Sequence, residues 1–470
     1  MNPKDGALPF AISAANQIRL WPIDAIDLPP EALVRVRKLS LMKHHDASFS
    51  WPFSGRLPLL LPLKIESNLV LPANLWLWEP MFGPPKSRDG FNIGIVCARP
   101  SHYNTVSHIV DEFWDADSFG RSRRDPNIYS IGRIGDHSVV IVLLSLDGKV
   151  NSAAAVASLR ASYPRLELVL VTGICGGVPG PHAGEELLLG DVVISKALVQ
   201  HDFGRQYPDK FEVKNKLDDC LGRPAKNIRN FVAQLQTNRI RTGVEDRALV
   251  HLKALQRRTK ETLRGADYRY PGADSDRLFP PTYVHRHHSG CEECVEGTAE
   301  VCDRSRELPC SEMGCDDREL VQRHRLDARR NLERAGGIDE AQAPYIFVGH
   351  LGSGDIVFNS GEERDRLAQA HDLIAFETEG AGLWDEFPCI VVKGVCNYAD
   401  SHKNKEWQNF AAATAAAVSK ALIEEYPKTD GQGDEGRVVS DAPVFHAVVS
   451  KCNIVTGFTS SGGTQVINFG

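Results

Sequence analysis

Two carboxylates and a threonine stand at the end of a short apolar run and could bind a sugar. Glu377, Thr378 and Glu379 follow DLIAF, a run that is typical of a buried strand. Carboxylates spaced two apart in a strand point to the same side, and burying them is costly unless they accept hydrogen bonds. Sugar hydroxyls are suitable donors, which predicts a substrate-binding role. The alternative is that backbone amides or arginines satisfy both carboxylates.

Small and polar residues also end other apolar runs. Gly176 and Gly177 close LELVLVTGICGG, where missing side chains would let backbone amides approach an anion or a sugar. Ser353 and Asp355 follow YIFVGHLG. A glycine-rich strand end is equally typical of an ordinary tight turn, so the glycines alone decide little. Arg133, which precedes another apolar run, could meet a phosphate or lie solvated on the surface.

These residues need strands whose carboxyl ends meet at one edge. Between residues 89 and 427, short apolar runs alternate with helical segments, and the alanine-rich stretch 409–426 closes the region as a strong helix former. This order predicts a doubly wound α/β domain with a mixed or parallel sheet, whose ligands bind at the carboxyl ends of the strands. The strands are expected at residues 91–98, 139–146, 166–177, 190–195, 345–354, 372–380 and 389–400.

A charged stretch at residues 209–340 interrupts this rhythm and is expected to be an insertion with some helices. Within it, Cys291 and Cys294 have the CxxC spacing of a zinc knuckle and follow a histidine-rich run. Three further cysteines come behind them: Cys302, Cys310 and Cys315. The pattern predicts a structural zinc site. The alternative is a mobile insert with exposed cysteines, which the loose CxxxxC spacing of the last pair favours.

The composition argues against several classes of function. The 470 residues carry a formal net charge of -7 with a pI near 6.2, so we expect no nucleic-acid partner. The start of the chain lacks a secretory signal, and the apolar run 57–63 is too short and too proline-rich to span a membrane. The eleven cysteines do not suggest a disulfide framework, which indicates a reducing compartment. We therefore expect a cytoplasmic protein.

The motifs occur in an order that resembles a known family. GIVCARPSHYNTV, VTGICGG, LGDVVIS with HDFGRQY, GHLGSGD, FETEGAG and KGVCNYADSHKN are similar to the nucleoside phosphorylase/nucleosidase superfamily, including the methylthioadenosine/S-adenosylhomocysteine nucleosidases. The likeness is strongest to versions found as N-terminal domains of fungal NOD-like receptors. It implies cleavage of the N-glycosidic bond of a purine nucleoside or nucleotide such as ATP. It also implies chemistry without a metal, a homo-oligomer, and an effector role in fungal immunity.

The resemblance implies roles for individual residues. Glu379 would hold the ribose hydroxyls, and Gly176 and Gly177 would line the sugar or phosphate pocket. Ser353 and Asp355 would support the base pocket. Phe376 would flank the purine, and Asp400 and His402 would lie near the pocket, with Asp400 alternatively capping a helix. Arg99, in the first motif, could meet a phosphate or lie solvated on the surface.

Three positions depart from the family. His102 replaces the glutamate that activates water, Asn397 replaces the acid that protonates the purine, and Thr378 replaces a methionine. Histidine can act as a base near neutral pH, but an amide cannot deliver a proton, and losing a general acid costs about 10² to 10⁴ in rate. Two functions stay open: a slow N-glycosidase, or a nucleotide-binding module that senses its ligand without turnover.

Both ends of the chain lie outside the expected domain. Residues 1–88 show no sustained periodicity, and residues 428–442 are polar and glycine-containing, as in a linker. Residues 443–470 carry β-prone runs around a Ser/Gly turn with little charge, and they resemble the short amyloid signalling motifs that fungal effectors share with NOD-like receptors. That likeness implies cross-β stacking and a receptor as partner. A disordered tail is the alternative.

Overall fold

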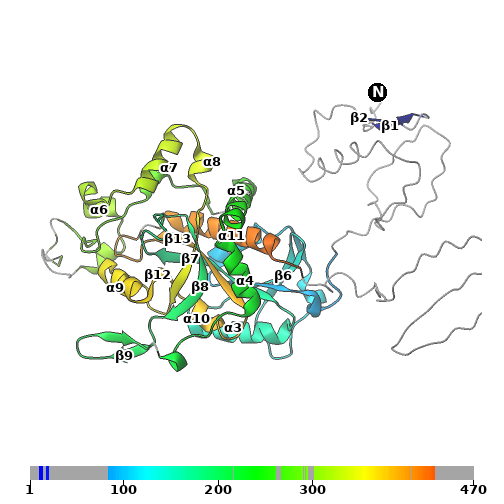
Figure 1. The fold of residues 1–470 in the computed structure, drawn as a ribbon, viewed down its shortest axis with the longest axis horizontal. Coiled ribbons are helices and arrows are strands. Elements are labelled where there is room, and N and C mark those ends of the chain that lie inside the picture. Colours follow the sequence, from blue (N-terminus) through cyan, green and yellow to red (C-terminus); the bar gives the residue numbers. More distant parts are fainter. Residues whose placement is uncertain are drawn as a thin grey trace, which may run out of the picture. The chain divides into compact units, whose positions relative to one another are not determined.

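The computed structural model describes residues 10–13, 17–20, 83–214, 216–260, 266–288, 291, 293–294, 301–403 and 405–428 (Figure 1). The chain divides into two units, Met1–Pro84 and Pro85–Gly470. In the first unit, β1 (Phe10–Ser13) and β2 (Gln17–Leu20) pair as an antiparallel hairpin. The amyloid-like stretch 443–470 lies outside the described residues, as do most of residues 1–88 and 428–442.

The second unit is built on a nine-stranded mixed sheet with the order β12-β11-β8-β13-β7-β3-β6-β5-β4. The pairs β13–β8, β5–β6 and β4–β5 are antiparallel, and the other neighbours in this order are parallel. The end of β7 also pairs with β12, so the strands from β12 to β7 close into a ring. The strands are β3 (Ile93–Cys97), β4 (Glu112–Trp114), β5 (Tyr129–Ile134), β6 (His137–Leu143), β7 (Leu168–Gly177), β8 (Val192–Gln200), β11 (Ile346–Ser353), β12 (Leu373–Glu377) and β13 (Cys389–Asn397).

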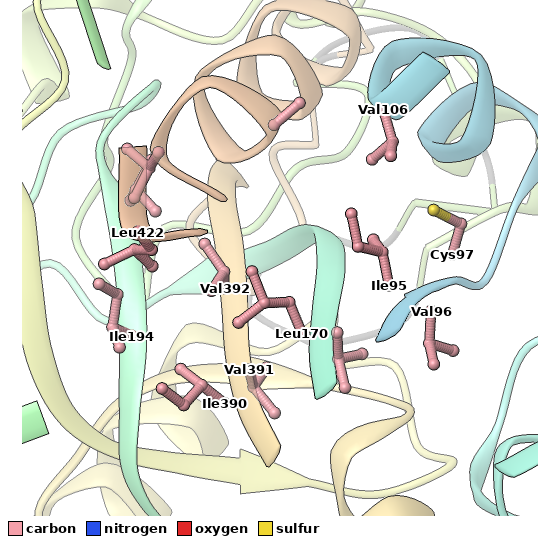
Figure 2. Close-up of a cluster of buried hydrophobic side chains, with 14 of the residues drawn as sticks. Ile95, Val96, Cys97, Val106, Leu170, Ile194, Ile390, Val391, Val392 and Leu422 are labelled. Carbon is pink, nitrogen blue, oxygen red and sulfur yellow. The ribbon is translucent and has the colours of Figure 1, made fainter. Parts of the chain in front are cut away.

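Helices cover both faces of this sheet. On one face, Ile95 of β3 points toward Val106 of α2 (Pro100–Ser107), while Val96 points to the other side (Figure 2). On that other side, a Cβ at Gly94 would lie 3.6 Å from Leu159 of α3 (Lys149–Ser162). The strands are continuous apolar runs because both faces are buried. The doubly wound mixed α/β fold expected from the sequence is therefore confirmed.

The helix α11 (Trp407–Glu425) packs against β13 and β7 on the same face as α2 (Figure 2). Its alanines allow so close an approach that a Cβ at Gly394 of β13 would overlap the backbone of Ala411. α5 (Asn238–Lys260) packs along α11 and adds Val244 and Leu252 to the main core. The first part of the expected insertion, with α4 (Lys226–Leu235) and α5, is thus a layer of the domain itself.

The remaining elements surround this core. They are β9 (Gly204–Gln206), β10 (Phe211–Val213), α6 (Cys310–Met313), α7 (His324–Arg334), α8 (Ile338–Ala341), α9 (Gly361–His371) and α10 (Gly380–Leu383). α7 is tied to the sheet by the fully buried Asp191, which accepts hydrogen bonds from Arg325 and Arg329. In the part of the chain that the structure describes, no helix is long and apolar enough to cross a membrane.

Candidate functional site

A cavity of about 170 Å³ opens at the carboxyl ends of β7, β12 and β13. One wall comes from the start of α2 and another from the loop after β11. This is the edge at which α/β sheets bind ligands. The lining consists of Arg99, His102, Ile174, Cys175, Gly176, Ile356, Val357, Phe358, Phe376, Glu377, Thr378, Glu379, Cys396, Asn397, Ala399, Lys403 and Gln408.

A buried lysine holds the two carboxylates of this site together. Lys393 lies in the middle of β13 and is fully buried, with its Nζ 3.5 Å from Glu377 Oε2 and hydrogen-bonded to Glu379 Oε2. Two carboxylates and one ammonium leave one excess negative charge when all three are ionised. Such a cluster can attract a hydroxyl donor or stabilise a developing positive charge.

The two glutamates have different surroundings. Glu377 ends β12, and its carboxylate accepts hydrogen bonds from the backbone N–H groups of Glu379 and Gly380, each at 3.0 Å. For Glu377, backbone amides are therefore the partners, which is the alternative considered from the sequence. Glu379 lies past the strand, at the N-terminus of α10, so the predicted strand alternation does not apply to it. Its carboxylate accepts from the Thr378 hydroxyl at 2.6 Å and from Lys393.

The charges determine the protonation of the cluster. Burial by itself raises the pKa of the Glu379 carboxyl, but the Lys393 ammonium and the Thr378 hydroxyl outweigh burial and bring that pKa below its ordinary value. Burial lowers the pKa of Lys393, but Glu379 and Glu377 outweigh it and raise that pKa above its usual range. Glu379 is therefore ionised at neutral pH and faces the cavity as an acceptor.

His102 lies at the start of α2, against the backbone of Gly173. The histidine is 4% exposed, and neither ring nitrogen has a hydrogen-bond partner among the described residues. Burial, assisted by the nearby charge of Lys393, lowers the pKa of His102 from 6.5 to about 3. Its affinity for a proton is therefore lower than that of an exposed histidine. The imidazole is neutral at pH 7 and can accept a proton, but only weakly, because its conjugate acid is strong.

Asn397 ends β13 at the opposite wall. Its Oδ1 accepts a hydrogen bond from the backbone N–H of Ala399 at 2.8 Å, which assigns the amide orientation, and its Nδ2 donates to Cys396 Sγ at 3.2 Å. The amide group retains a second N–H for a ligand. A purine nitrogen could accept that hydrogen bond, but no proton would be transferred.

The structure brings most of the predicted site residues to this cavity but not all. Gly177 packs against Leu187 and Val395, and like Gly176 it belongs to strand β7 rather than to a phosphate-binding loop. Ser353 is buried behind the cavity and accepts a hydrogen bond from the N–H of Ala381 at 2.8 Å. These two residues can support the wall but do not line it.

Asp355 and Arg133 also lie away from the lining residues. The Asp355 carboxylate accepts a hydrogen bond from the N–H of Lys149 at 2.9 Å and so caps α3. Arg133 is on β5, near the β4 edge of the sheet, where it pairs with Glu112 at 3.7 Å and donates to the carbonyl of Gly135 at 2.7 Å. Neither residue is among the cavity-lining residues: Arg133 lies within β5, away from the cavity, and Asp355 follows β11 but turns its carboxylate toward α3.

Lys393 is the central residue that the sequence reasoning did not single out. The signal was a single charged residue inside the otherwise apolar run CIVVKGVC. A lone lysine in a buried strand is costly unless it is paired, so its position predicts a carboxylate partner.

Two groups of cysteine and histidine side chains lie outside the cavity, and each could hold a metal ion. The knuckle centre consists of His287, Cys291, Cys294 and Cys302, and the His402 centre consists of His285, Cys310, Cys315 and His402. The structure thus brings Cys291 and Cys294 together, as expected for a knuckle. It places His402 in the second centre; the residue does not line the cavity itself but is next to Lys403, which does.

The fold and the cavity define an α/β domain with an ionised carboxylate at the carboxyl edge of its sheet, and comparison with known proteins shows what this domain is similar to. Residues 92–251 match the phosphorylase superfamily. A nucleotide-binding leucine-rich repeat (NLR)-like protein of Hyaloscypha variabilis is 28% identical over 346 residues, which cover 72% of this chain and 30% of that protein. A 5′-methylthioadenosine/S-adenosylhomocysteine nucleosidase of Mycobacterium tuberculosis is 30% identical over 112 residues, which cover 24% of this chain and 39% of the relative.

Among solved structures, the futalosine hydrolase of Helicobacter pylori has a TM-score of 0.40 and 14% sequence identity, and covers 71% of this chain and 98% of that chain. The alignments span 30% and 39% of the two curated relatives, less than half of either. The match of residues 92–251 agrees with the resemblance that the sequence motifs carry.

Proposed function

We propose that this domain binds a purine nucleoside or nucleotide and that it breaks the N-glycosidic bond slowly or not at all. The observation that carries the proposal is the buried Glu379 carboxylate, which is held ionised by Lys393 at the edge of the cavity. An ionised carboxylate in a site that excludes water is a strong acceptor for the two neighbouring hydroxyls of a ribose. The Phe376 ring and the Asn397 amide lie within the same lining and provide an apolar face and a donor for the base.

The same geometry explains why turnover would be slow. Breaking the bond gives positive charge to the sugar, which the ionised Glu379 carboxylate favours. The leaving base must also receive a proton, and Asn397 has none to give. Neutral His102 can orient an attacking water but takes its proton weakly. Binding is therefore retained while the chemical step lacks its acid.

Incubation of the purified protein with adenosine, inosine or ATP, with and without phosphate, tests the proposal. We expect binding of at least one of these ligands by calorimetry and little free base by chromatography. Glu379→Gln should abolish binding, since the amide oxygen is a weaker acceptor and its nitrogen repels donors, whereas Glu362→Gln on the exposed face of α9 should not change it. Wild-type protein that binds none of the ligands would refute the proposal, as would an unchanged affinity for Glu379→Gln in a folded protein.

We further propose that the knuckle centre binds a structural zinc ion. The set of one imidazole and three thiols is a common ligand set for structural zinc. His287 Nδ1 lies 3.5 Å from Cys294 Sγ and 3.4 Å from Cys302 Sγ, and both cysteines are buried. The burial of these cysteines argues against the alternative of an insert with exposed thiols.

The relation to an NLR-like protein supports a role in fungal immunity as an effector, with a NOD-like receptor as partner through residues 443–470. A homo-oligomer and a cytoplasmic location complete the proposal. Size-exclusion chromatography with light scattering tests the first of these, and a monomer across the micromolar range would refute it.

A further inference from the structure

The His402 centre joins the insertion to the wall of the candidate active site. Three of its residues, His285, Cys310 and Cys315, come from the charged stretch between α5 and α7. The fourth, His402, comes from the loop that follows β13. All four ligand atoms lie within 4.8 Å of one another.

The distances between these atoms match a tetrahedral zinc site. Zinc–sulfur bonds of about 2.3 Å and zinc–nitrogen bonds of about 2.0–2.1 Å at a tetrahedral angle place sulfur and nitrogen about 3.5 Å apart. The Sγ atom of Cys310 is 3.6 Å from His285 Nδ1 and 3.5 Å from His402 Nδ1. The Sγ atom of Cys315 is 3.5 Å and 3.9 Å from the same two nitrogens. Each sulfur therefore faces both imidazoles. A thiol–imidazole hydrogen bond would require each sulfur to face only one imidazole.

The outer hydrogen bonds orient both imidazoles for metal binding. His285 Nε2 lies 2.9 Å from the carbonyl of Leu308, and His402 Nε2 lies 2.8 Å from the carbonyl of Tyr283. A carbonyl only accepts hydrogen bonds, so each Nε2 carries the proton and each Nδ1 has a free lone pair. This tautomer, held by a backbone carbonyl, is the usual arrangement of histidine ligands in zinc sites.

The surrounding hydrophobic cluster is small. Its buried members are Phe279, Met313 and Cys315, and the helix within it, α6, has only four residues. So small a core is insufficient to hold loops in place, and folds of this size commonly depend on a metal or disulfides. The cysteines here are free, which favours the metal.

We propose that His285, Cys310, Cys315 and His402 bind a second structural zinc ion, which fixes the loop after β13 against the insertion and so sets one wall of the cavity. The loop begins after Asn397 and carries Ala399 and Lys403, and all three residues line the cavity. Two hydrogen bonds couple the loop to the centre. The N–H of His285 donates to Ser401 Oγ at 3.0 Å, and the N–H of His402 donates to Asp400 Oδ1 at 2.9 Å.

Metal analysis of the purified full-length protein tests this assignment. We expect two zinc ions per chain when both centres are filled. His402→Ala should remove one, Cys294→Ser should remove the other, and Cys220→Ser at an exposed cysteine outside both centres should remove neither. His402→Cys should retain the second zinc, since a thiolate is also a zinc ligand, and this rescue separates ligation from mere packing of the imidazole.

Hydrogen exchange supplies the readout on the cavity wall. In a folded His402→Ala protein, the backbone amides of residues 399–403 should exchange faster, while those of β3 should not change. Two results would overturn the proposal: a zinc content that His402→Ala leaves unchanged, or a His402→Ala protein that loses zinc without faster exchange in the loop. If Cys294→Ser lowers the zinc content and His402→Ala does not, only the knuckle centre binds zinc. That result would also overturn the assignment of the second ion.

Discussion

Replacing Lys393 with methionine removes the only cation that contacts both carboxylates of the candidate site, as far as the described residues show. The Glu377 and Glu379 side chains are 0% and 5% exposed, so water cannot replace the ammonium. Removing one partner of a buried ion pair costs about 3–5 kcal/mol of unfolding free energy. We expect a loss of this size at pH 8, since methionine fills a similar space without the charge.

The loss should be smaller at lower pH. Without Lys393, burial and mutual repulsion raise the pKa of the two carboxyls, and the folded variant takes up a proton. The unfolded chain, with an ordinary glutamate pKa of 4.5, is deprotonated above about pH 5.5. Stability therefore falls as pH rises, by about 1.4 kcal/mol per pH unit for one proton. In the wild type, the pKa of Glu379 is below 4.5 and that of Lys393 is above 10.5, so neither titrates in this window, whereas burial raises the pKa of Glu377 above its ordinary value. The loss compares the two proteins, so its pH dependence refers to the additional proton that the variant takes up.

Urea denaturation followed by tryptophan fluorescence at pH 6 and pH 8 measures this difference. The loss caused by Lys393→Met should be about 2.7 kcal/mol smaller at pH 6. Lys420→Met is the matched control, because the two carboxylates that Lys420 pairs with, Asp111 and Glu424, are 25% and 24% exposed and can be solvated. The control should show a smaller loss with little dependence on pH. A loss for Lys393→Met below about 1 kcal/mol at pH 8, or an equal loss at both pH values, would refute this account of the cluster.

Three further predictions concern other parts of the chain. His102→Glu together with Asn397→Asp should raise release of purine base by about two orders of magnitude or more in the chromatographic assay, and equal rates would show that these positions do not limit turnover. Gly394→Ala should destabilise the domain by about 1–3 kcal/mol in a urea titration, because its Cβ would overlap the backbone of α11, whereas Gly243→Ala, with open space around it, should not. A peptide of residues 443–470 should form cross-β fibrils, detected by thioflavin fluorescence and fibre diffraction, and Gln465→Pro should prevent them. A wild-type peptide that stays monomeric when seeded would leave only the interpretation of a disordered tail.

The local pattern of apolar and helix-forming residues determined the architecture of the domain. Each of the seven apolar runs became a strand, because a segment such as LELVLVTG is too apolar for a surface and too rich in β-branched residues for a preferred helix. The alanine-rich stretch became α11 for the opposite reason, since alanine has the highest helix propensity and a small side chain for close packing. The order of strands and helices then left little choice but a doubly wound sheet, whose carboxyl edge was the expected place of the site.

Tertiary structure decided which residues meet at that edge. Glu379 reaches Lys393 because the chain turns into α10 after β12, and not by strand alternation. Arg133 lies within β5, and the sheet order takes that strand to the far side. The sequence could not predict which side chains form the His402 centre, because His402 lies about ninety residues after the cysteines that it joins. Only the packing of the insertion against the loop after β13 brings these side chains together. Burial likewise set the pKa of His102, because the same side chain on the surface would titrate near its ordinary value.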